Sequence, residues 1–342
     1  MPHRTFFWFF FPSGLAMLMF IGLPIISSFF QSLHIEPEQI LMEVEKCDPF
    51  GCKTETKVDI EATNKLQEEQ PLGRFNGLGT YGDRNHLAFD EIKEAWTNSS
   101  SIAEFTDILL NLPFYKALLF TLTFCFAVTP PVVVLGFIVA LSVNTITKSL
   151  KGPTIFGVIL PMIVTPLIGS LVLFWMIDAK GILGSFIQFL FDDPNLSLKS
   201  SSQLTWITLI IYGIWHNTPF AFVVFYAALQ TVPQDPIEAA IIDGASRYER
   251  VRHIVIPHLY PVATFIILIC LMDNFRVLEP IIGFAAEGVA QSLSWMIYND
   301  LRSENKMLFG SAGATSMLTI IGVAILLTPV LIRTWREFRT ER

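Results

Sequence analysis

Long apolar runs alternate with polar stretches along this chain, and the pattern predicts membrane-spanning helices. A bilayer core of about 30 Å needs about 20 mostly apolar residues to cross it as a helix. Six stretches reach that length: residues 5–33, 117–143, 153–177, 204–229, 262–284 and 308–332. We therefore expect an all-α membrane protein with six transmembrane helices. Prolines such as Pro161 and Pro166 should kink these helices rather than break them, because neighbouring helices can satisfy the freed carbonyls.

One polar segment, residues 34–112, interrupts the apolar pattern. It holds sixteen acidic and seven basic residues, a net charge of −9, which leaves +2 for the rest of a chain whose net charge is −7. The segment is too polar to be embedded in lipid and too long for a plain connector. We expect a first transmembrane helix over 1–33, a small helical extracytoplasmic insertion over 34–112, and a core over 113–342 with a cytoplasmic loop over 230–260.

The composition agrees with a membrane protein, since 52% of the 342 residues are hydrophobic and only 15% are charged, against about 25% charged in soluble domains. No basic stripe is present, which disfavours a nucleic-acid partner. The first apolar run is too long for a signal-peptide core and lacks a cleavage site, so we expect it to be retained. Lys and Arg concentrate at the cytoplasmic ends of membrane helices, and six spans place both termini on the side that receives most of them. The residues on that side are Arg4, Lys148, Lys151, Arg247, Arg250, Arg252, Arg333, Arg336, Arg339 and Arg342.

Two cysteines, Cys47 and Cys52, flank a turn-like sequence, CDPFGC, in the polar segment. In an oxidising outer compartment this arrangement predicts a small disulfide loop, and two free thiols are the alternative. No further metal ligands adjoin the pair.

The loop over residues 230–260 carries signals for two short helices. Asp235 is a good N-cap for the first helix, and Gly244 suits a left-handed terminator. The second helix would begin at Ser246 and end at Pro257. Capping alone is equally consistent with an ordinary connector.

A longer pattern in the same loop favours a functional role over an ordinary connector. It reads Glu238-Ala239-Ala240, three residues, Gly244, nine residues, then Ile254-x-Ile256-Pro257. This pattern resembles the EAA motif of the permease subunits of ATP-binding-cassette (ABC) importers. Ile256 in place of leucine is the one departure.

The resemblance implies a bacterial inner-membrane permease whose loop docks on separate ATPase subunits. The implied ATPase-coupling residues are Glu238, Ala239, Ala240, Asp243, Gly244 and Pro257. The chain itself has no GxxxxGK[ST] phosphate-binding pattern, so we expect no enzyme activity and no cofactor on it. ATP and magnesium would bind to the partner subunits.

Within the family the chain resembles the maltose-type carbohydrate-uptake permeases. That similarity implies a sugar substrate, a second and different permease chain, two ATPase subunits and an extracytoplasmic solute-binding protein. A departure at residues 283–291, GFAAEGVAQ, where sugar permeases often have Gly-Gly-Pro, keeps a polyol or glycerol phosphate open as substrate. A secondary transporter is a further alternative, and an intramembrane enzyme is disfavoured because HExxH and GxSxG are lacking.

Polar residues inside the fourth and fifth apolar stretches are the candidates for substrate contact, because polar groups at membrane depth face a bundle interior or a wet cavity. The spacing of Asp273, Arg276 and Glu279 predicts one shared helix face, with Glu279 the least suited to contact substrate. An ion-pair network that only fixes helix packing is the alternative. The candidate substrate-binding residues are Asp273, Asn274, Arg276, Trp215, His216 and Asn217.

Overall fold

The structure is a computed structural model in which two compact units are distinct, one formed by residues 117–295 and the other by residues 1–116 with 296–342. It describes residues 2–35, 40–48, 51–70, 72–193, 196–199, 201–302 and 308–340.

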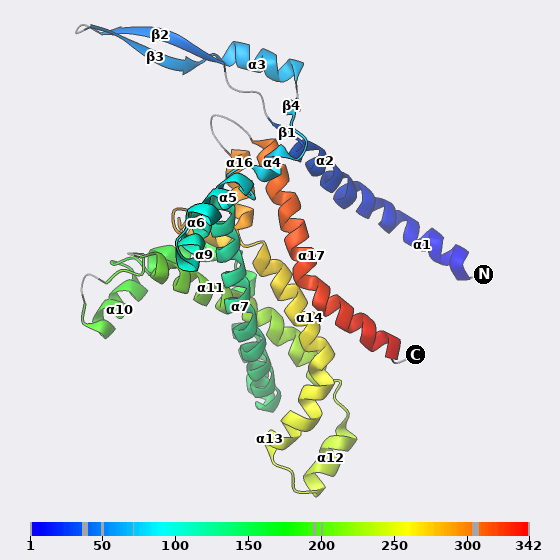
Figure 1. The fold of residues 1–342 in the computed structure, drawn as a ribbon. Coiled ribbons are helices and arrows are strands. Elements are labelled where there is room, and N and C mark those ends of the chain that lie inside the picture. The colour runs from blue at the N-terminus through cyan, green and yellow to red at the C-terminus, as the bar shows by residue number, and fades with distance from the viewer. Residues whose placement is uncertain are drawn as a thin grey trace. The chain divides into compact units, whose positions relative to one another are not determined.

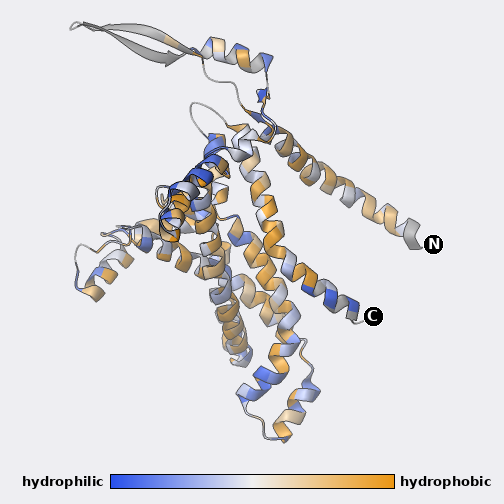
Figure 2. Cartoon of the chain, viewed as in Figure 1, coloured by the Kyte–Doolittle hydropathy of each residue, from blue (hydrophilic) through white to orange (hydrophobic). Residues whose placement is uncertain are grey.

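The predicted transmembrane helices are present. Within the described residues, five helices are long and apolar enough to cross a membrane, and a bent pair of helices forms a sixth candidate span. Their apolar character is visible in Figure 2, where α13 and the C-terminal end of α17 are hydrophilic. The single-helix candidates are Thr5–Ser32, Pro113–Thr145, Ser202–Leu229, Arg247–Phe275 and Phe309–Arg333.

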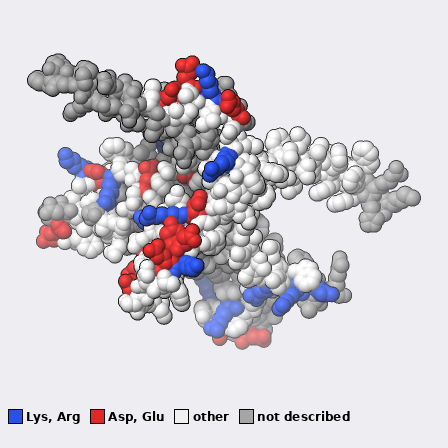
Figure 3. Space-filling model, turned by 45° about the horizontal axis from the view of Figure 1, so that its top comes forward, with Lys and Arg blue, Asp and Glu red and all other residues white. Residues whose placement is uncertain are grey.

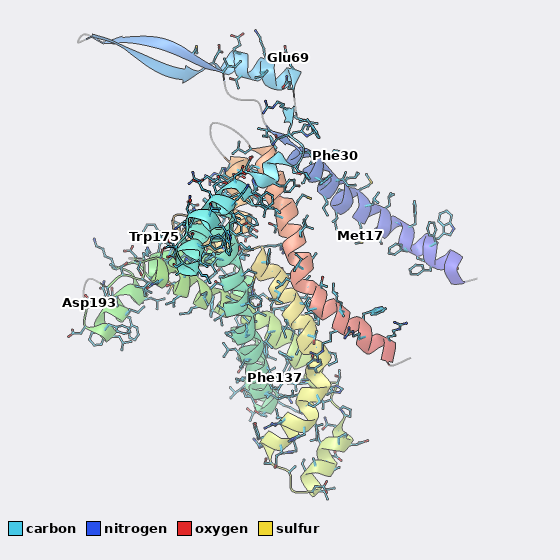
Figure 4. The ribbon with its side chains drawn as sticks, viewed as in Figure 1. Met17, Phe30, Glu69, Phe137, Trp175 and Asp193 are labelled. Atoms are coloured by element: carbon cyan, nitrogen blue, oxygen red, sulfur yellow. The ribbon has the colours of Figure 1, made fainter. Side chains whose placement is uncertain are left out.

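The unit of residues 117–295 holds a core of aromatic and aliphatic side chains contributed mainly by α7, α11 and α14. Phe137, labelled in Figure 4, packs edge-to-face on Phe225 with ring centroids 5.4 Å apart. The helices of this unit are α7 (Pro113–Thr145), α8 (Lys148–Ile163), α9 (Pro166–Met176), α10 (Ile182–Phe191), α11 (Ser202–Leu229), α12 (Gln234–Ile242), α13 (Arg247–Arg250), the π-helix η2 (Val251–Val255), α14 (Ile256–Phe275), α15 (Glu279–Gly283) and the start of α16 (Leu293–Arg302).

The third predicted span is broken rather than kinked. Helices α8 and α9 meet at an angle of 94°, and the residues between them, Val164 and Thr165, both have extended backbone. A proline disfavours the helical conformation of the residue before it, and here Pro166 opens α9. The expectation of a continuous helix through Pro166 is therefore wrong, whereas Pro161 is accommodated inside α8.

The fifth predicted span begins earlier and ends earlier than expected. Helix runs from Arg247 to Phe275, so the second helix of the cytoplasmic loop continues directly into the span. The expectation that Pro257 stops this helix is wrong. In the π-helix η2 the Ile256 N–H donates to the Val251 carbonyl, five residues back, and Pro257 occupies the first turn of α14.

The other unit is built around α2 and α17. Gly310 and Gly313 let the two helices approach closely, since a Cβ added at Gly313 would lie 2.7 Å from the Ser28 carbonyl oxygen. Ahead of α2, the side chains of Met17 and its neighbours are exposed. No charged residue occurs from Thr5 to Ser32, a stretch that is white in Figure 3. The elements of this unit are α1 (Pro2–Met17), the π-helix η1 (Leu18–Gly22), α2 (Leu23–Ser32), β1 (His34–Ile35), β2 (Leu41–Asp48), β3 (Gly51–Val58), α3 (Ile60–Glu69), β4 (Arg74–Phe75), α4 (Gly79–Gly82), α5 (Phe89–Asn98), α6 (Ile102–Asn111), the rest of α16, and α17 (Phe309–Thr340).

The insertion over 34–112 is not wholly helical, contrary to the prediction. Strands β2 and β3 form an antiparallel hairpin whose register places Cys47 opposite Cys52. The side chains of these two cysteines lie outside the described part of the chain, so their disulfide remains a prediction.

Candidate functional site

A cavity of about 500 Å³ lies among α7, α9, α11, α14, α15 and α16, within the unit of residues 117–295. Its size falls in the range of small-molecule sites, and polar groups form much of its wall. The lining residues are Phe124, Pro166, Tyr212, Gly213, His216, Asn217, Asp273, Asn274, Arg276, Val277, Leu278, Glu279, Pro280 and Ser294.

The charged candidates meet in this cavity, but not on one helix face. Helix α14 ends at Phe275 with Arg276 as its C-cap, and Glu279 opens the separate helix α15. The prediction of a shared face is wrong because the chain turns after Arg276. The turn nevertheless returns Glu279 to the same wall as Asp273. The Arg276 guanidinium lies 3.0 Å from the Asp273 carboxylate.

Two hydrogen bonds of the Asn274 side chain, one with Asn217 and one with Thr129, connect three spans. The Asn217 amide donates to the Asn274 side-chain oxygen over 3.1 Å, and the Asn274 amide donates to the Thr129 hydroxyl over 3.1 Å. Asn274 is only 2% exposed, so it holds the wall of the cavity together more than it offers groups to a ligand. The side-chain oxygen of Asn217 has no hydrogen-bond partner of its own within the described residues.

An aromatic pair forms another part of the wall. His216 stacks on Tyr212 with ring centroids 5.8 Å apart and an interplanar angle of 13°, and the Tyr212 hydroxyl donates to the Pro166 carbonyl over 2.8 Å. Trp215, although predicted, lies outside the lining and is about half exposed. Tyr212 was missed, yet it precedes His216 by four residues and so shares its helix face. Ser294 was also missed, and no local signal pointed to it.

The first helix of the cytoplasmic loop, α12, ends as predicted. Gly244 has a φ of +80°, and the Ala245 N–H donates to the Ala240 carbonyl over 2.8 Å, the closure that a left-handed glycine permits. Its start differs from the prediction, because Pro233 rather than Asp235 is the N-cap. Asp235 falls in the first helical turn, where a carboxylate favours the positive end of the helix dipole.

The second helix of the loop begins as predicted with a capping box between Ser246 and Glu249. Most of the loop is exposed, including large apolar side chains: Ile242 is 86% exposed and Tyr248 is 69% exposed. The motif residues Glu238 and Ala239 on α12 are exposed too, as are Asp243 and Pro257. The loop therefore presents a structured, partly apolar surface.

Comparison with known proteins identifies the family. Residues 102–341 match the family described as "binding-protein-dependent transport system inner membrane component". The chain belongs to this family, and it is accordingly a membrane permease subunit of the type found in ABC importers.

Among individual relatives, the trehalose/maltose transport system permease protein MalF of Thermococcus litoralis is 32% identical over 37% of this chain and 45% of its own length. The sn-glycerol-3-phosphate transport system permease protein UgpA of Shigella flexneri is 28% identical over 51% of this chain and 59% of its own length. The chain thus spans about half the length of these curated relatives.

The fold agrees with solved ABC transporters. A bacterial alginate ABC transporter in complex with an alginate pentasaccharide-bound periplasmic protein has a chain with a TM-score of 0.58 at 18% identity, covering 70% of this chain and 85% of that chain. A chain of a bacterial ABC transporter involved in the import of alginate gives a TM-score of 0.57 at 16% identity, covering 81% of this chain and 97% of that chain. The predicted fold class is confirmed.

Proposed function

We propose that this chain is one half of the translocation pathway of an ATP-driven, binding-protein-dependent importer for a sugar. The residues lining the cavity hold the solute during passage, and the loop over 230–260 transmits the movement of ATPase subunits. Relatives named for trehalose/maltose support the substrate class, and amide, hydroxyl and carboxylate groups beside aromatic rings suit a polyhydroxylated ring.

The observation that carries this proposal is the continuity of one helix between the loop and the cavity. The helix formed by α13, η2 and α14 runs without a break from Arg247 to Phe275, and it can be traced in Figure 1. Gly244 and Ser246 lie just before its first residue, and Asp273 and Asn274 form its last turn at the cavity. Displacement of the loop by a partner would therefore be transmitted along this helix to the wall of the cavity.

A permease chain of this kind would work as part of a larger complex. We propose two ATPase subunits on the loop, a second and different permease chain, and an extracytoplasmic binding protein that delivers the solute. Both termini are cytoplasmic in this arrangement, on the side where Lys148 and Arg252 lie. The exposed Ile242 and Tyr248 provide apolar contact for the ATPase, and Glu238 offers a carboxylate to it.

A phosphate-bearing solute is the second candidate cargo, because relatives named for sn-glycerol-3-phosphate match as well. A secondary transporter is less well supported. The family matched over residues 102–341 is described as a binding-protein-dependent transport component, which argues against a carrier coupled to an ion.

The test is the ATPase rate of the purified complex in lipid, measured with a panel of loaded candidate binding proteins. Stimulation by one loaded protein would name the cargo. Gly244→Asp should abolish the stimulation, because it adds a charge to the docking surface and a side chain at a left-handed backbone position. Gly152→Asp, in open space outside the loop, is the control for the added charge and should behave as the unmodified protein. Absence of a co-purifying ATPase, together with no effect of Gly244→Asp, would refute the proposal.

A further inference from the structure

The fixed charges facing the cavity are unbalanced. Two carboxylates, Asp273 and Glu279, and one guanidinium, Arg276, line it. Arg276 is engaged with Asp273 at 3.0 Å, whereas the Glu279 carboxylate has no ion pair within the described residues. The cavity therefore carries one uncompensated negative charge.

The remaining polar groups of the lining carry no fixed charge. They are the amides of Asn217 and Asn274, the hydroxyls of Tyr212 and Ser294, and the ring of His216. A carboxylate accepts strong hydrogen bonds from hydroxyl groups, so Glu279 can bind a neutral polyol or sugar. An anionic solute would meet repulsion from Glu279 and would have to separate Arg276 from Asp273 to gain a counter-charge.

We propose that Glu279 makes this cavity selective for uncharged, hydroxyl-rich solutes and against phosphorylated or uronate-bearing ones. This inference rests on the proposed function, in which the cavity is the solute site. It assigns a specificity-determining role to a residue that the sequence had suggested to be mainly structural, and it decides between the two candidate cargoes.

The charge of the cavity is tested with Ser294→Cys in the assembled complex. The thiol is placed on the cavity wall, and the native Cys125 and Cys270 are buried; the complex without this substitution gives the labelling background. Cationic and anionic methanethiosulfonate reagents of similar size are compared by their reaction rates. We expect the cationic reagent to react faster, and Glu279→Gln to lower the cationic-to-anionic ratio by about threefold or more.

The matched control is Glu287→Gln, which removes a carboxylate outside the lining and should leave the ratio unchanged. Arg276→Gln should raise the ratio, because it leaves both lining carboxylates uncompensated. Equal or faster reaction of the anionic reagent, or an unchanged ratio in Glu279→Gln, would overturn the inference.

Solute selectivity is tested on the same thiol by protection. Neutral mono- and disaccharides, glycerol, hexose phosphates and glycerol 3-phosphate are each added before labelling. At least one neutral solute should slow the reaction, and its phosphate ester should not. Protection by the phosphate esters alone, or no protection by any neutral solute, contradicts the inference. The labelling does not depend on ATP hydrolysis, so its outcome is separate from the Gly244→Asp test of the proposed function.

Discussion

Asn217 on α11 donates a hydrogen bond to the side chain of Asn274 on α14, and the two groups are 3.1 Å apart. Because Asn274 also donates to Thr129 on α7, one buried amide connects three spans at the wall of the cavity. Each of these groups would lack a partner if the spans separated. The connection therefore fixes how the spans pack and, through them, the width of the cavity.

Asn274→Ala should lower the stability of the purified protein by about 1–3 kcal/mol, because it removes two hydrogen bonds and leaves Asn217 and Thr129 without a partner. Hydrogen bonds between membrane helices average about 0.6 kcal/mol, so the lower end of this range is expected. Thr218→Val is the control, since among the described residues the Thr218 hydroxyl bonds only to the Ile214 carbonyl in its own helix. Denaturation midpoints in detergent measure both. Equal midpoints for the two variants would show that the amide connection does not stabilise the packing.

Gly136 on α7 lies closely against Ala221 on α11. A Cβ at this position would lie 2.5 Å from the Ala221 Cβ and 3.0 Å from the Ala221 backbone carbon. Gly136→Ala should therefore force the helices apart and cost about 1–3 kcal/mol. Gly157→Ala on α8 meets nothing within 4 Å and should be neutral or stabilise its helix by up to about 1 kcal/mol. Comparable losses in both variants, measured by the same midpoints, would contradict the packing argument.

The sequence predicted the spans well because their signal, a long run without charge, is local. The break before Pro166 was not predictable in this way. Pro161 lies inside helix only a few residues earlier, so a proline alone does not specify a break. Contacts with another span, such as the hydrogen bond that the Tyr212 hydroxyl donates to the Pro166 carbonyl at the start of α9, are not visible in the local sequence. The placement of Glu279 and Asp273 in one cavity wall likewise depends on a turn after Arg276; Pro280 marks the start of α15 but does not specify the direction of that turn.

The β2–β3 hairpin, in contrast, did have a local signal. From Glu43 to Lys46 charged and apolar residues partly alternate, and the sequence between Cys47 and Cys52 is rich in turn residues. The turn at residues 244–249 was the most predictable part of the candidate site, because the left-handed Gly244 and the capping box of Ser246 and Glu249 are encoded within a few residues. The start of α12 and the end of the second helix were predicted wrongly. Contacts between distant spans were the least predictable.

Substitutions at Gly244 can distinguish a need for its left-handed backbone conformation from a need for a small side chain at the docking surface. Its φ of +80° disfavours most side chains, and a left-handed residue other than glycine costs about 1–2 kcal/mol. Asparagine tolerates this region better than alanine or valine. The stimulated ATPase rate, which measures coupling, should therefore be highest in Gly244→Asn, lower in Gly244→Ala and lowest in Gly244→Val. If all three variants lose stimulation equally, the available space at the docking surface matters and the backbone conformation does not.

The ion pair between Lys199 and Asp178 should make the stability of the protein depend on pH. The Lys199 ammonium lies 3.1 Å from the Asp178 carboxylate and lowers the pKa of that carboxyl, with further help from the Lys180 backbone N–H. A lowered pKa stabilises the fold above the ordinary carboxyl pKa of about 3.9, and this contribution disappears as the pH falls through the folded value. The stability difference between the unmodified protein and Lys199→Met should thus be present at pH 7 and shrink below about pH 4. Lys148→Met, which removes a lysine remote from Asp178 in sequence, should show no such pH dependence.

The helix from Arg247 to Phe275 contains its own point of bending. The π-helix η2 is followed by Pro257 and then by Pro261 inside α14, and both features weaken the regular hydrogen-bond ladder of a helix. We expect the movement of the loop to be absorbed partly here before it reaches Asp273.

Pro261→Ala should restore a backbone hydrogen bond and stiffen this helix, because proline is about 3 kcal/mol less favourable than alanine in a helix interior. The protein should become more stable, while the ATPase stimulation by a loaded binding protein changes by severalfold. Pro329→Ala on α17, an exposed proline also inside a helix, should stabilise without altering stimulation, because α17 does not begin at the loop. An identical effect of the two substitutions on stimulation would mean that general stiffness, rather than bending between the loop and the cavity, controls coupling.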